Sequence, residues 1–321
     1  MAVDAFINSS PHKKTKDCFM TLSIPETRFY KVADNVFSVS TYLGHSSDFF
    51  AKIMDNYEPF AFDACDCAFS LEVFAGEKVP AYTEEMRQDE EGQRIVCGST
   101  DAGESVFDFS LFEKYVGTLV CSKDYKTSKL FVPNAEYSSY LKFAVNNALM
   151  VLYAIATAPC NTVLFHAAVV KRDGKGYMFL GKSGTGKSTH ARLWLKYNDG
   201  CELLNDDNPV VRFYETENGK GYARVFGSPW SGKTPCYKNE DCKLGGFVLL
   251  AQAPYNKIAR LHGVQAYAAI LPCISGKRWE RSVADGLHKT ENALAANVPA
   301  WYLECLPDEA AAKLCLETIA R

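Results

Sequence analysis

The stretch Gly181-Lys182-Ser183-Gly184-Thr185-Gly186-Lys187-Ser188 decides how the rest of the chain is interpreted, because it has the form G-x-x-x-x-G-K-S. An apolar segment, residues 176–180, precedes it, and a segment free of glycine and proline, residues 189–196, follows it. These flanks predict a strand, a loop and a helix, which is the context in which this motif binds phosphate. The glycines allow the loop to turn its N–H groups toward an anion, and the helix N-terminus adds further unpaired N–H groups.

The motif also predicts which residues hold a nucleotide and its metal ion. Lys187 is expected to reach the β and γ phosphates, and the Ser188 hydroxyl to ligate Mg²⁺. The alternative is a glycine-rich turn that ends in Lys-Ser by chance, which the flanking strand and helix signals disfavour. We therefore expect ATP and Mg²⁺ as ligands. The nucleotide-binding residues are then expected to be Gly181, Lys182, Ser183, Gly184, Thr185, Gly186, Lys187, Ser188 and Thr189.

Size and charge exclude several classes of protein. The chain has 321 residues, 47% of them hydrophobic, which is enough for a large core and for two domains. A net charge of −3, with scattered Lys and Arg, argues against nucleic acid or a membrane surface as a partner. The apolar run at residues 148–158 is shorter than the ~18 residues that a membrane helix needs. Residues 1–15 lack the apolar core of a signal peptide, so we expect a soluble, cytoplasmic protein.

The cysteines do not form a recognisable metal or disulfide pattern. There are twelve, spread along the chain without any C-x-x-C pair. Reduced, mostly buried thiols explain this distribution better than zinc ligands do.

The chain divides into two regions of different character. Residues 21–132 are rich in Phe, Tyr, Val and Thr and contain short runs that alternate with period two, which predicts half-buried antiparallel strands. Within them, the acidic tract at residues 84–91 is interpreted as an exposed loop. Residues 134–158 place apolar side chains at three- and four-residue spacing and predict a long amphipathic helix. We expect a smaller β-rich N-terminal domain, residues 1–133, followed by an α/β P-loop domain with a mixed sheet, residues 134–321.

The second region predicts a strand hairpin that leads into the phosphate loop. Residues 162–170 are expected to form its first strand, and a glycine-containing turn connects them to residues 176–180. After the loop helix, residues 201–205 predict another strand, which ends in Asp206-Asp207-Asn208. A further hairpin is expected at residues 210–226, then a loop at residues 227–233. Asp308 is expected to cap a C-terminal helix.

Asp206 and Asp207 are the candidate acidic residues of the site. An open α/β sheet binds its ligands at the carboxyl ends of its strands, where this pair is expected to lie. Adjacent side chains of an extended segment point to opposite sides, so one of the two can face Mg²⁺, directly or through water, while the other faces the acceptor hydroxyl. The alternative is a solvated Asp-Asp-Asn-Pro turn; the phosphate loop upstream favours the functional interpretation.

Two further residues have weaker support. His166 lies in an apolar strand, where a histidine is more often a packed core residue than a catalytic one. Lys233 lies in the glycine-bearing loop and could neutralise the charge on a transferring phosphoryl group. A solvated lysine explains Lys233 equally well.

The segment from His166 to Asp207 resembles the catalytic domain of the HPr kinase/phosphorylase family, whose core is shared with phosphoenolpyruvate carboxykinases. That family has a strand with His before small and β-branched residues, a short turn, a second strand, the loop and then a strand ending in Asp-Asp. Residues 166–170, 174–176, 181–188 and 206–207 follow this order. The resemblance implies that Asp207 accepts a proton from the substrate hydroxyl, that His166 and Lys187 are active-site residues, and that Ser188 ligates Mg²⁺. We then expect Asp206 to be the second residue that holds Mg²⁺.

The resemblance extends over about residues 160–250 and has departures. Thr189 stands where the family has Glu, and the family's Ile-Arg-Gly signature with its metal-binding Glu has no clear counterpart. The implied activity is an ATP- and Mg²⁺-dependent kinase that phosphorylates a hydroxyl, on a serine of a protein or peptide or on a serine-like metabolite. The N-terminal domain is then the candidate for acceptor recognition. Relatives in the family form hexamers, which leaves a homo-oligomer open.

Two other classes of function remain open on the sequence. One is a carboxykinase-like phosphotransferase acting on a small molecule, which requires an additional metal-binding Lys/His/Asp set that the sequence does not present. The other is a non-catalytic nucleotide-binding sensor or assembly protein, which would bind ATP without turnover.

Overall fold

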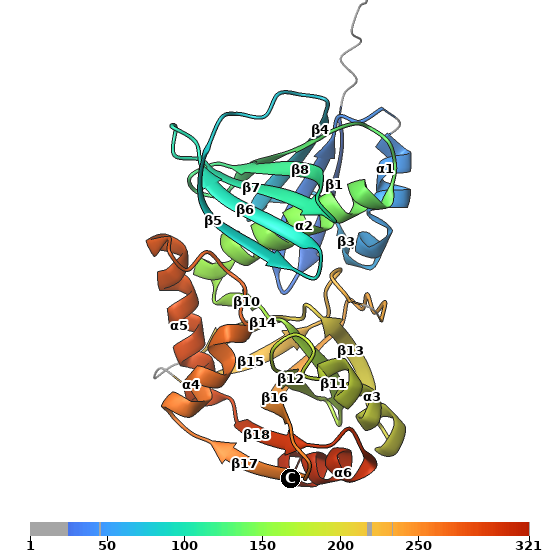
Figure 1. The fold of residues 1–321 in the computed structure, drawn as a ribbon, viewed down its shortest axis with the longest axis vertical. Coiled ribbons are helices and arrows are strands. Elements are labelled where there is room, and N and C mark those ends of the chain that lie inside the picture. Colours follow the sequence, from blue (N-terminus) through green and yellow to red (C-terminus); the bar gives the residue numbers. More distant parts are fainter. Residues whose placement is uncertain (1–24, 45, 217–219, 233, 321) are drawn as a thin grey trace, which may run out of the picture.

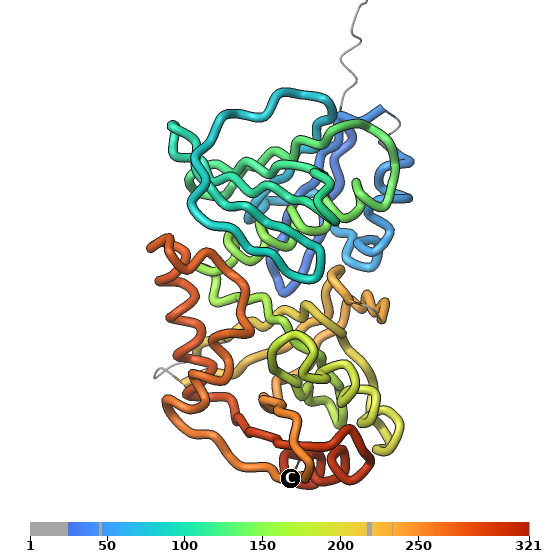
Figure 2. Tube along the Cα trace, viewed as in Figure 1, coloured from blue at the N-terminus to red at the C-terminus, as the bar shows by residue number. Residues whose placement is uncertain are grey.

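The computed structural model has a mixed α/β architecture with two nine-stranded sheets, one in each half of the chain (Figure 1). It describes residues 25–44, 46–216, 220–232 and 234–320. The chain completes the upper half of the view before it enters the lower half (Figure 2). The two halves are therefore consecutive in sequence, and helix α2 (Ser139–Ala156) lies where the chain passes from one to the other.

The first sheet has the strand order β3-β1-β2-β4-β9-β8-β7-β6-β5. Most neighbours are antiparallel as predicted, but β4 pairs in parallel with both β2 and β9. Period-two alternation reports which face of a strand is buried and not which way the neighbour runs, so it could not reveal this. The strands are β1 (Glu26–Val32), β2 (Asn35–Thr41), β3 (Ala61–Phe62), β4 (Phe69–Ala75), β5 (Thr83–Glu90), β6 (Gln93–Ser99), β7 (Ser105–Leu111), β8 (Lys114–Cys121) and β9 (Thr127–Val132). Helix α1 (Ser46–Ile53) and the 3-10 helix η1 (Asp55–Phe60) lie between β2 and β3.

The acidic tract at residues 84–91 corrects one prediction. It forms strand β5, not a loop, and all eight residues of the strand are exposed. Pairing with β6 satisfies the backbone hydrogen bonds along one edge of β5, while the side chains on both faces of the strand remain in solvent. A strand with no buried face has no apolar alternation, so the sequence pattern gave no sign of it.

Helix α2 (Ser139–Ala156) is the helix predicted over residues 134–158. It begins at the cap Ser138, whose side chain accepts a hydrogen bond from the Leu141 N–H. By length and composition this 18-residue helix is apolar enough to cross a membrane, because it begins nine residues before the short apolar run at residues 148–158. However, 56% of it is buried inside the protein, where it contacts β4, β7, β8 and β9 of the first sheet and β10 of the second. Its apolar composition is therefore accounted for by packing.

The second sheet has the order β10-β14-β15-β16-β12-β11-β13, with β18 beside β16 and β17 beside β18. It is mixed, as expected: β12 and β16 are parallel, whereas β11 is antiparallel to both β12 and β13. Its strands are β10 (Thr162–Leu164), β11 (Ala167–Arg172), β12 (Lys175–Leu180), β13 (Glu202–Asp207), β14 (Val210–Glu215), β15 (Gly221–Phe226), β16 (Asp241–Gln252), β17 (Lys257–Leu261) and β18 (Ala300–Cys305). The accompanying helices are η2 (Ala158–Cys160), α3 (Lys187–Tyr197), α4 (Val264–Ile270), η4 (Leu271–Cys273), α5 (Arg281–Asn297) and α6 (Glu309–Ile319).

Helices cover both faces of the second sheet. Ala168 and Val170 of β11 pack in one cluster with α3 and α6, whereas Ala167 and Val169 pack in the other cluster with α5. This is why residues 167–170 read as a continuous apolar run in the sequence. The second cluster continues through α2 into the first sheet, so one core of buried side chains spans both halves. The predicted domain boundary near residue 133 stays a prediction.

The strand predicted over residues 162–170 is broken in two at Phe165 and His166. The Phe165 N–H donates to the Pro209 carbonyl, and the His166 N–H donates to the Cys273 carbonyl at 2.7 Å. The chain therefore changes hydrogen-bond partners at this point, between β10 and β11. The break leaves His166 immediately before β11, at the edge of the sheet.

Candidate functional site

The G-x-x-x-x-G-K-S segment has the predicted strand, loop and helix geometry. Strand β12 ends at Leu180, and α3 begins at Lys187. Gly184 and Gly186 have φ angles of 77° and 106°, in the region that side-chain-bearing residues rarely adopt, so the loop needs glycine at these positions. Gly186 is the N-cap of α3 and supplies no side-chain cap. The first-turn N–H groups of α3 therefore remain available to an anion.

Lys187 lies across this loop and is 8% exposed. Its Nζ donates to the Gly181 carbonyl at 3.0 Å and to the Lys182 carbonyl at 3.3 Å. Burial lowers the pKa of the Lys187 ammonium, and the nearby carboxylate of Asp207 partly offsets this. A buried ammonium beside a ring of backbone groups is suited to the charge-assisted binding of phosphate.

The other predicted loop residues have local roles. The Thr185 hydroxyl donates to the Lys182 carbonyl at 2.7 Å and so closes the turn. The Thr189 hydroxyl accepts a hydrogen bond from Arg192 one turn along α3. A Cβ atom at Gly181 would lie 3.1 Å from the Thr185 side chain, so the start of the loop is closely packed.

Ser188 and Asp206 meet at the start of α3. The Ser188 hydroxyl donates to Oδ1 of Asp206 at 2.7 Å, and Asp206 is 5% exposed. Asp206 reaches this point because β13 runs parallel to β12 on the far side of β11, so both strands end at the same edge. A hydroxyl and a carboxylate oxygen in contact form a hard oxygen pair that fits Mg²⁺, which keeps its other positions for water and phosphate.

The described residues do not form a closed metal site made of protein ligands alone. Among the described residues there is no group of three or more His, Cys, Asp or Glu side chains that could hold a metal ion. Every cysteine in the described ranges carries a free thiol. The Ser188–Asp206 pair is thus the candidate metal position, of the open kind that magnesium shares with a phosphate substrate.

Asp207 is held in a strained conformation. Its φ angle is 133°, which is a rare value for a residue with a side chain. The chain around it is fixed by the segment at residues 227–232: Asp207 forms an isolated bridge with Ser231, and the Gly232 N–H donates to the Asp206 carbonyl at 2.7 Å. A Cβ at Gly232 would lie 3.1 Å from the Asp207 Cβ, which explains the glycine. Such over-determined strain is typical of functional sites.

The side chains of His166 and Asp207 lie next to each other, where β11 begins and β13 ends. Nδ1 of His166 lies 3.6 Å from Oδ1 of Asp207, while Oδ2 of Asp207 accepts from the Asn208 side chain at 2.8 Å. Burial raises the pKa of the Asp207 carboxyl, and the His166 and Lys187 charges only partly oppose this. Burial also lowers the pKa of the His166 imidazole despite the carboxylate beside it. A carboxylate with a raised pKa is a better proton acceptor than an ordinary one.

A buried polar network, which no sequence pattern indicates, holds the end of β13 in place. Asn205 is fully buried; its Oδ1 accepts from the Asn208 N–H, and its Nδ2 donates to the Ser228 hydroxyl and the Trp230 carbonyl. The first half of the chain reaches it as well, because the Trp230 indole donates to the Tyr57 hydroxyl at 2.9 Å. The clustering of small residues at 227–232 signalled a loop, and nothing in the sequence linked it to residue 57.

The tip of the β5–β6 hairpin is the second unpredicted component. The Ser183 hydroxyl donates to Oε1 of Glu91 at 2.9 Å, so the first sheet touches the phosphate loop directly. The carboxylates of Glu90 and Glu91 also act on the pKa of His166. The sequence predicts an exposed loop at residues 84–91 and does not indicate this contact.

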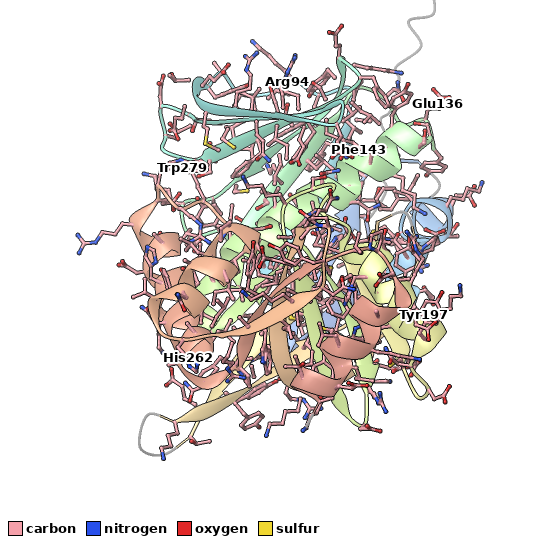
Figure 3. All side chains as sticks on the ribbon, turned by 60° about the horizontal axis from the view of Figure 1, so that its bottom comes forward. Arg94, Glu136, Phe143, Tyr197, His262 and Trp279 are labelled. Carbon is pink, nitrogen blue, oxygen red and sulfur yellow. The ribbon has the colours of Figure 1, made fainter. Side chains whose placement is uncertain are left out.

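Lys233, a predicted catalytic residue, lies outside the described residues. His190 packs edge-on against the Phe179 ring, and burial lowers its pKa to about 4. His262, for which the sequence suggested no role, lies exposed at the periphery of the second half (Figure 3).

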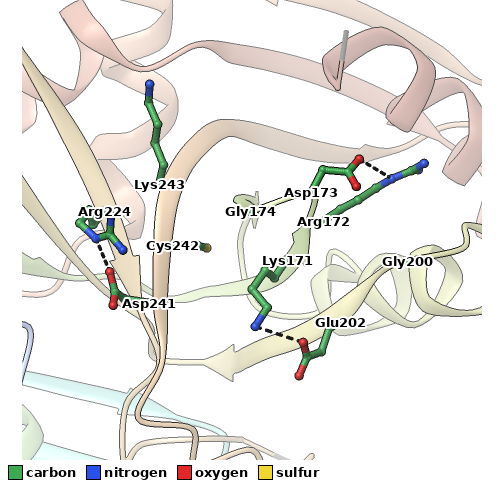
Figure 4. Close-up of a pocket in the computed structure, with 10 residues that line it drawn as sticks. All are labelled: Lys171, Arg172, Asp173, Gly174, Gly200, Glu202, Arg224, Asp241, Cys242 and Lys243. Carbon is green, nitrogen blue, oxygen red and sulfur yellow. Dashed lines mark hydrogen bonds and ion pairs between the residues drawn. The ribbon is translucent and has the colours of Figure 1, made fainter.

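A second charged hollow lies at the opposite ends of β11, β12 and β13. This cavity of about 380 Å³ contains several ion pairs, in which Lys171 contacts Glu202, Arg172 contacts Asp173, and Arg224 contacts Asp241 (Figure 4). Four cations and three carboxylates line the hollow, so its charges nearly balance and leave an excess of only one positive charge for a ligand. Its lining residues are Lys171, Arg172, Asp173, Gly174, Gly200, Glu202, Arg224, Asp241, Cys242 and Lys243.

Comparisons with known proteins do not identify a family. No protein-family model matches the chain, and no curated protein sequence is significantly similar to it.

Proposed function

We propose that this chain is an ATP- and Mg²⁺-dependent kinase that transfers the γ-phosphoryl group to a hydroxyl, on a serine of a protein or peptide or on a serine-like metabolite. The observation that carries the proposal is the convergence of three features at one sheet edge. They are the phosphate loop with Lys187, the Ser188–Asp206 oxygen pair at 2.7 Å, and the strained, partly buried Asp207. Phosphoryl transfer needs these three functions: binding of the phosphates, a metal position and a group that orients the nucleophile.

The nucleotide half of the reaction rests on the loop. The N–H groups of the loop and of the first turn of α3 would bind the β and γ phosphates, with Lys187 supplying a positive charge. Mg²⁺ on Ser188 and Asp206 would neutralise charge that develops on the phosphate oxygens. These contacts require no movement of β12 or β13, because both strands already end at this edge.

Asp207 is the residue proposed to activate the acceptor hydroxyl. The acceptor oxygen would form a bond to the γ-phosphorus while the bond from that phosphorus to the β–γ bridging oxygen breaks and ADP leaves. Asp207 would take the proton of the acceptor hydroxyl, which its raised pKa favours. His166, 3.6 Å from this carboxylate, would orient it and limit its access to solvent.

The resemblance to the HPr kinase/phosphorylase family agrees with this assignment. The strand hairpin before the loop and the Asp-Asp pair at the end of β13 are the elements on which the resemblance rests. We propose the same family-like core for the second half of the chain, and Lys233 as a further cation of the site.

The experiment is a transfer assay with γ-labelled ATP and a panel of serine peptides and free serine, with nucleotide binding measured in parallel. We expect acceptor-dependent transfer that Asp207→Asn lowers by about 10²–10⁴-fold while ATP still binds. Asp173→Asn, at the other end of β11, is the matched control and should transfer like the wild type. Binding of ATP without transfer to any acceptor would favour the sensor or assembly alternative instead.

A further inference from the structure

Strand β5 (Thr83–Glu90) is an unusually accessible edge of the first sheet. In the part of the chain that the structure describes, it is the last strand in the sheet order and pairs with β6 alone, and all eight of its residues are exposed (Figure 1). The strand at the other end of the sheet, β3, has only two residues. Proteins commonly keep edge strands short to prevent unwanted pairing, and β5 does not follow that rule.

The turn after β5 shows which backbone groups face outward. Glu91 and Gly92 have φ angles of 48° and 81°, which is a two-residue type I′ turn, with Glu90 opposite Gln93. The residues that flank such a turn form a hydrogen-bonded pair, and the pairing alternates along the strand. Arg87 and Asp89 are therefore in non-hydrogen-bonded positions, so their N–H and C=O groups point away from β6.

The edge is acidic. Four carboxylates, Glu84, Glu85, Asp89 and Glu90, accompany a single cation, Arg87. Arg87 pairs with Glu84, and Arg94 of β6 pairs with Asp89. Among the described residues, Glu85 accepts a hydrogen bond only from Ser99, and Glu90 only from Gln88, both of them neutral side chains. The free edge thus has an excess of negative charge next to unpaired backbone groups.

The C-terminal end of β5 lies close to the candidate active site. Directly after β5, Glu91 accepts the hydrogen bond from Ser183 of the phosphate loop. The carboxylate of Glu90 acts on the pKa of both Lys187 and His166. A peptide bound along β5 would therefore have the residues next to the C-terminal end of β5 close to the groups proposed for phosphoryl transfer.

We propose that the free edge of β5 binds an extended, cationic segment of the phosphoryl acceptor by β-strand addition. This rests on the proposed function for the identity of the segment as an acceptor. Backbone hydrogen bonds would supply affinity and the carboxylates would select lysine- or arginine-rich partners. A second copy of this chain is a poor occupant, because pairing two β5 strands would place like charges opposite one another.

The direct test measures peptide binding without nucleotide, by fluorescence anisotropy. The probe is a short labelled peptide that alternates lysine and valine around a central serine, and its counterpart has glutamate in place of lysine. We expect the lysine peptide to bind at least about tenfold more tightly and to weaken as salt is added. Equal binding of the two peptides would overturn the proposal.

A protein variant tests the edge itself. Arg87→Pro removes an outward N–H without removing a bond to β6, and should lower binding of the lysine peptide by at least about tenfold. The matched control Arg87→Ala keeps that N–H and removes a positive charge, so it should bind the lysine peptide at least as well as the wild type. If Arg87→Pro binds like Arg87→Ala, strand addition at β5 is wrong.

A change in the peptide gives the same information if Arg87→Pro does not fold. N-methylation of alternate peptide nitrogens blocks strand addition on one edge of the peptide and leaves the protein unaltered. Binding that persists with both methylation patterns would contradict the proposal, as would a dimer of this chain that Arg87→Pro dissociates.

The outcomes also separate this inference from the proposed function. Edge-dependent peptide binding without phosphoryl transfer would support docking and contradict the kinase. Transfer to peptides that is insensitive to Arg87→Pro would support the kinase and contradict docking at β5.

Discussion

Charged residues lie at both ends of strands β11, β12 and β13, but their ion pairing, burial and pKa shifts differ between the two ends. At the end with the cavity, the carboxylates lie in ion pairs, and the pKa of Glu202 is lowered by Lys238 and Lys171. At the end with the phosphate loop, burial raises the pKa of Asp207, and its backbone is strained. Both ends look equally charged in the sequence. The environment of each carboxylate distinguishes the candidate active site from solvated surface.

The largest difference between the two ends is expected in nucleotide affinity. Lys187→Met should weaken ATP binding by about 10–100-fold, because a charge-assisted hydrogen bond contributes about 1.5–3 kcal/mol. The matched change at the cavity end, Lys171→Met, should leave ATP affinity unaltered. Isothermal titration calorimetry measures both. If the two variants lose the same affinity, the loop is not the nucleotide site.

Backbone strain offers the next comparison. Asp207→Gly should raise the free energy of unfolding by about 1 kcal/mol, because relief of strain at φ 133° exceeds the entropic cost of glycine. Asp173, at the cavity end, also has a positive φ, of 49°, but in a turn that aspartate tolerates well. Asp173→Gly should therefore change stability by less than about 0.5 kcal/mol. Denaturant unfolding without nucleotide measures the difference, and a destabilised Asp207→Gly would show that the strain has been misjudged.

A third comparison concerns pH. Because the pKa of Asp207 is raised in the folded state, its ionisation opposes folding, and the stability lost grows as pH rises from the unfolded pKa through the folded one. Asp207→Asn should thus be more stable than the wild type at neutral pH, with the difference shrinking as pH falls into the acidic range. His166, Asp206 and Lys187 also act on the pKa of Asp207, and Glu90 and Glu91 act on that of His166; these groups are common to the wild type and the variant. Thermal unfolding across pH is the measurement, and a difference that grows toward acid would reverse the assignment.

The sequence could predict the parts of the site that are local. The loop, the hairpin before it and the Asp206-Asp207 strand end are confirmed as elements of structure, because each depends on neighbours within a few residues. Contacts between distant segments could not be predicted. Ser183 and Glu91 are 92 positions apart, and Tyr57 and Trp230 are 173 apart.

Missed features of the fold have the same origin. Strand β5 has no apolar face, so only its pairing with β6 reveals it. The break at His166 depends on Cys273 and Pro209, which the chain supplies much later. Burial raises the pKa of Asp207, and the segment at residues 231–232, which follows later in the chain, packs against it. A sequence pattern contains no measure of such burial.

The smallest effect is expected at the cavity end and has the opposite pH dependence. The pKa of Glu202 is lowered by its two lysine partners, so its ionisation favours folding, and that stability is present above the unfolded pKa and lost as pH falls through the folded one. Glu202→Gln should cost about 0.2–1 kcal/mol at neutral pH, since the pair is largely solvated and screened. The cost should vanish in acid and diminish in high salt, and ATP affinity should not change. Asp207→Asn and Glu202→Gln thus remove one carboxylate each from opposite ends of β13, and we expect them to shift stability at neutral pH in opposite directions. Shifts of the same sign would mean that the two ends of the sheet do not differ in the way proposed.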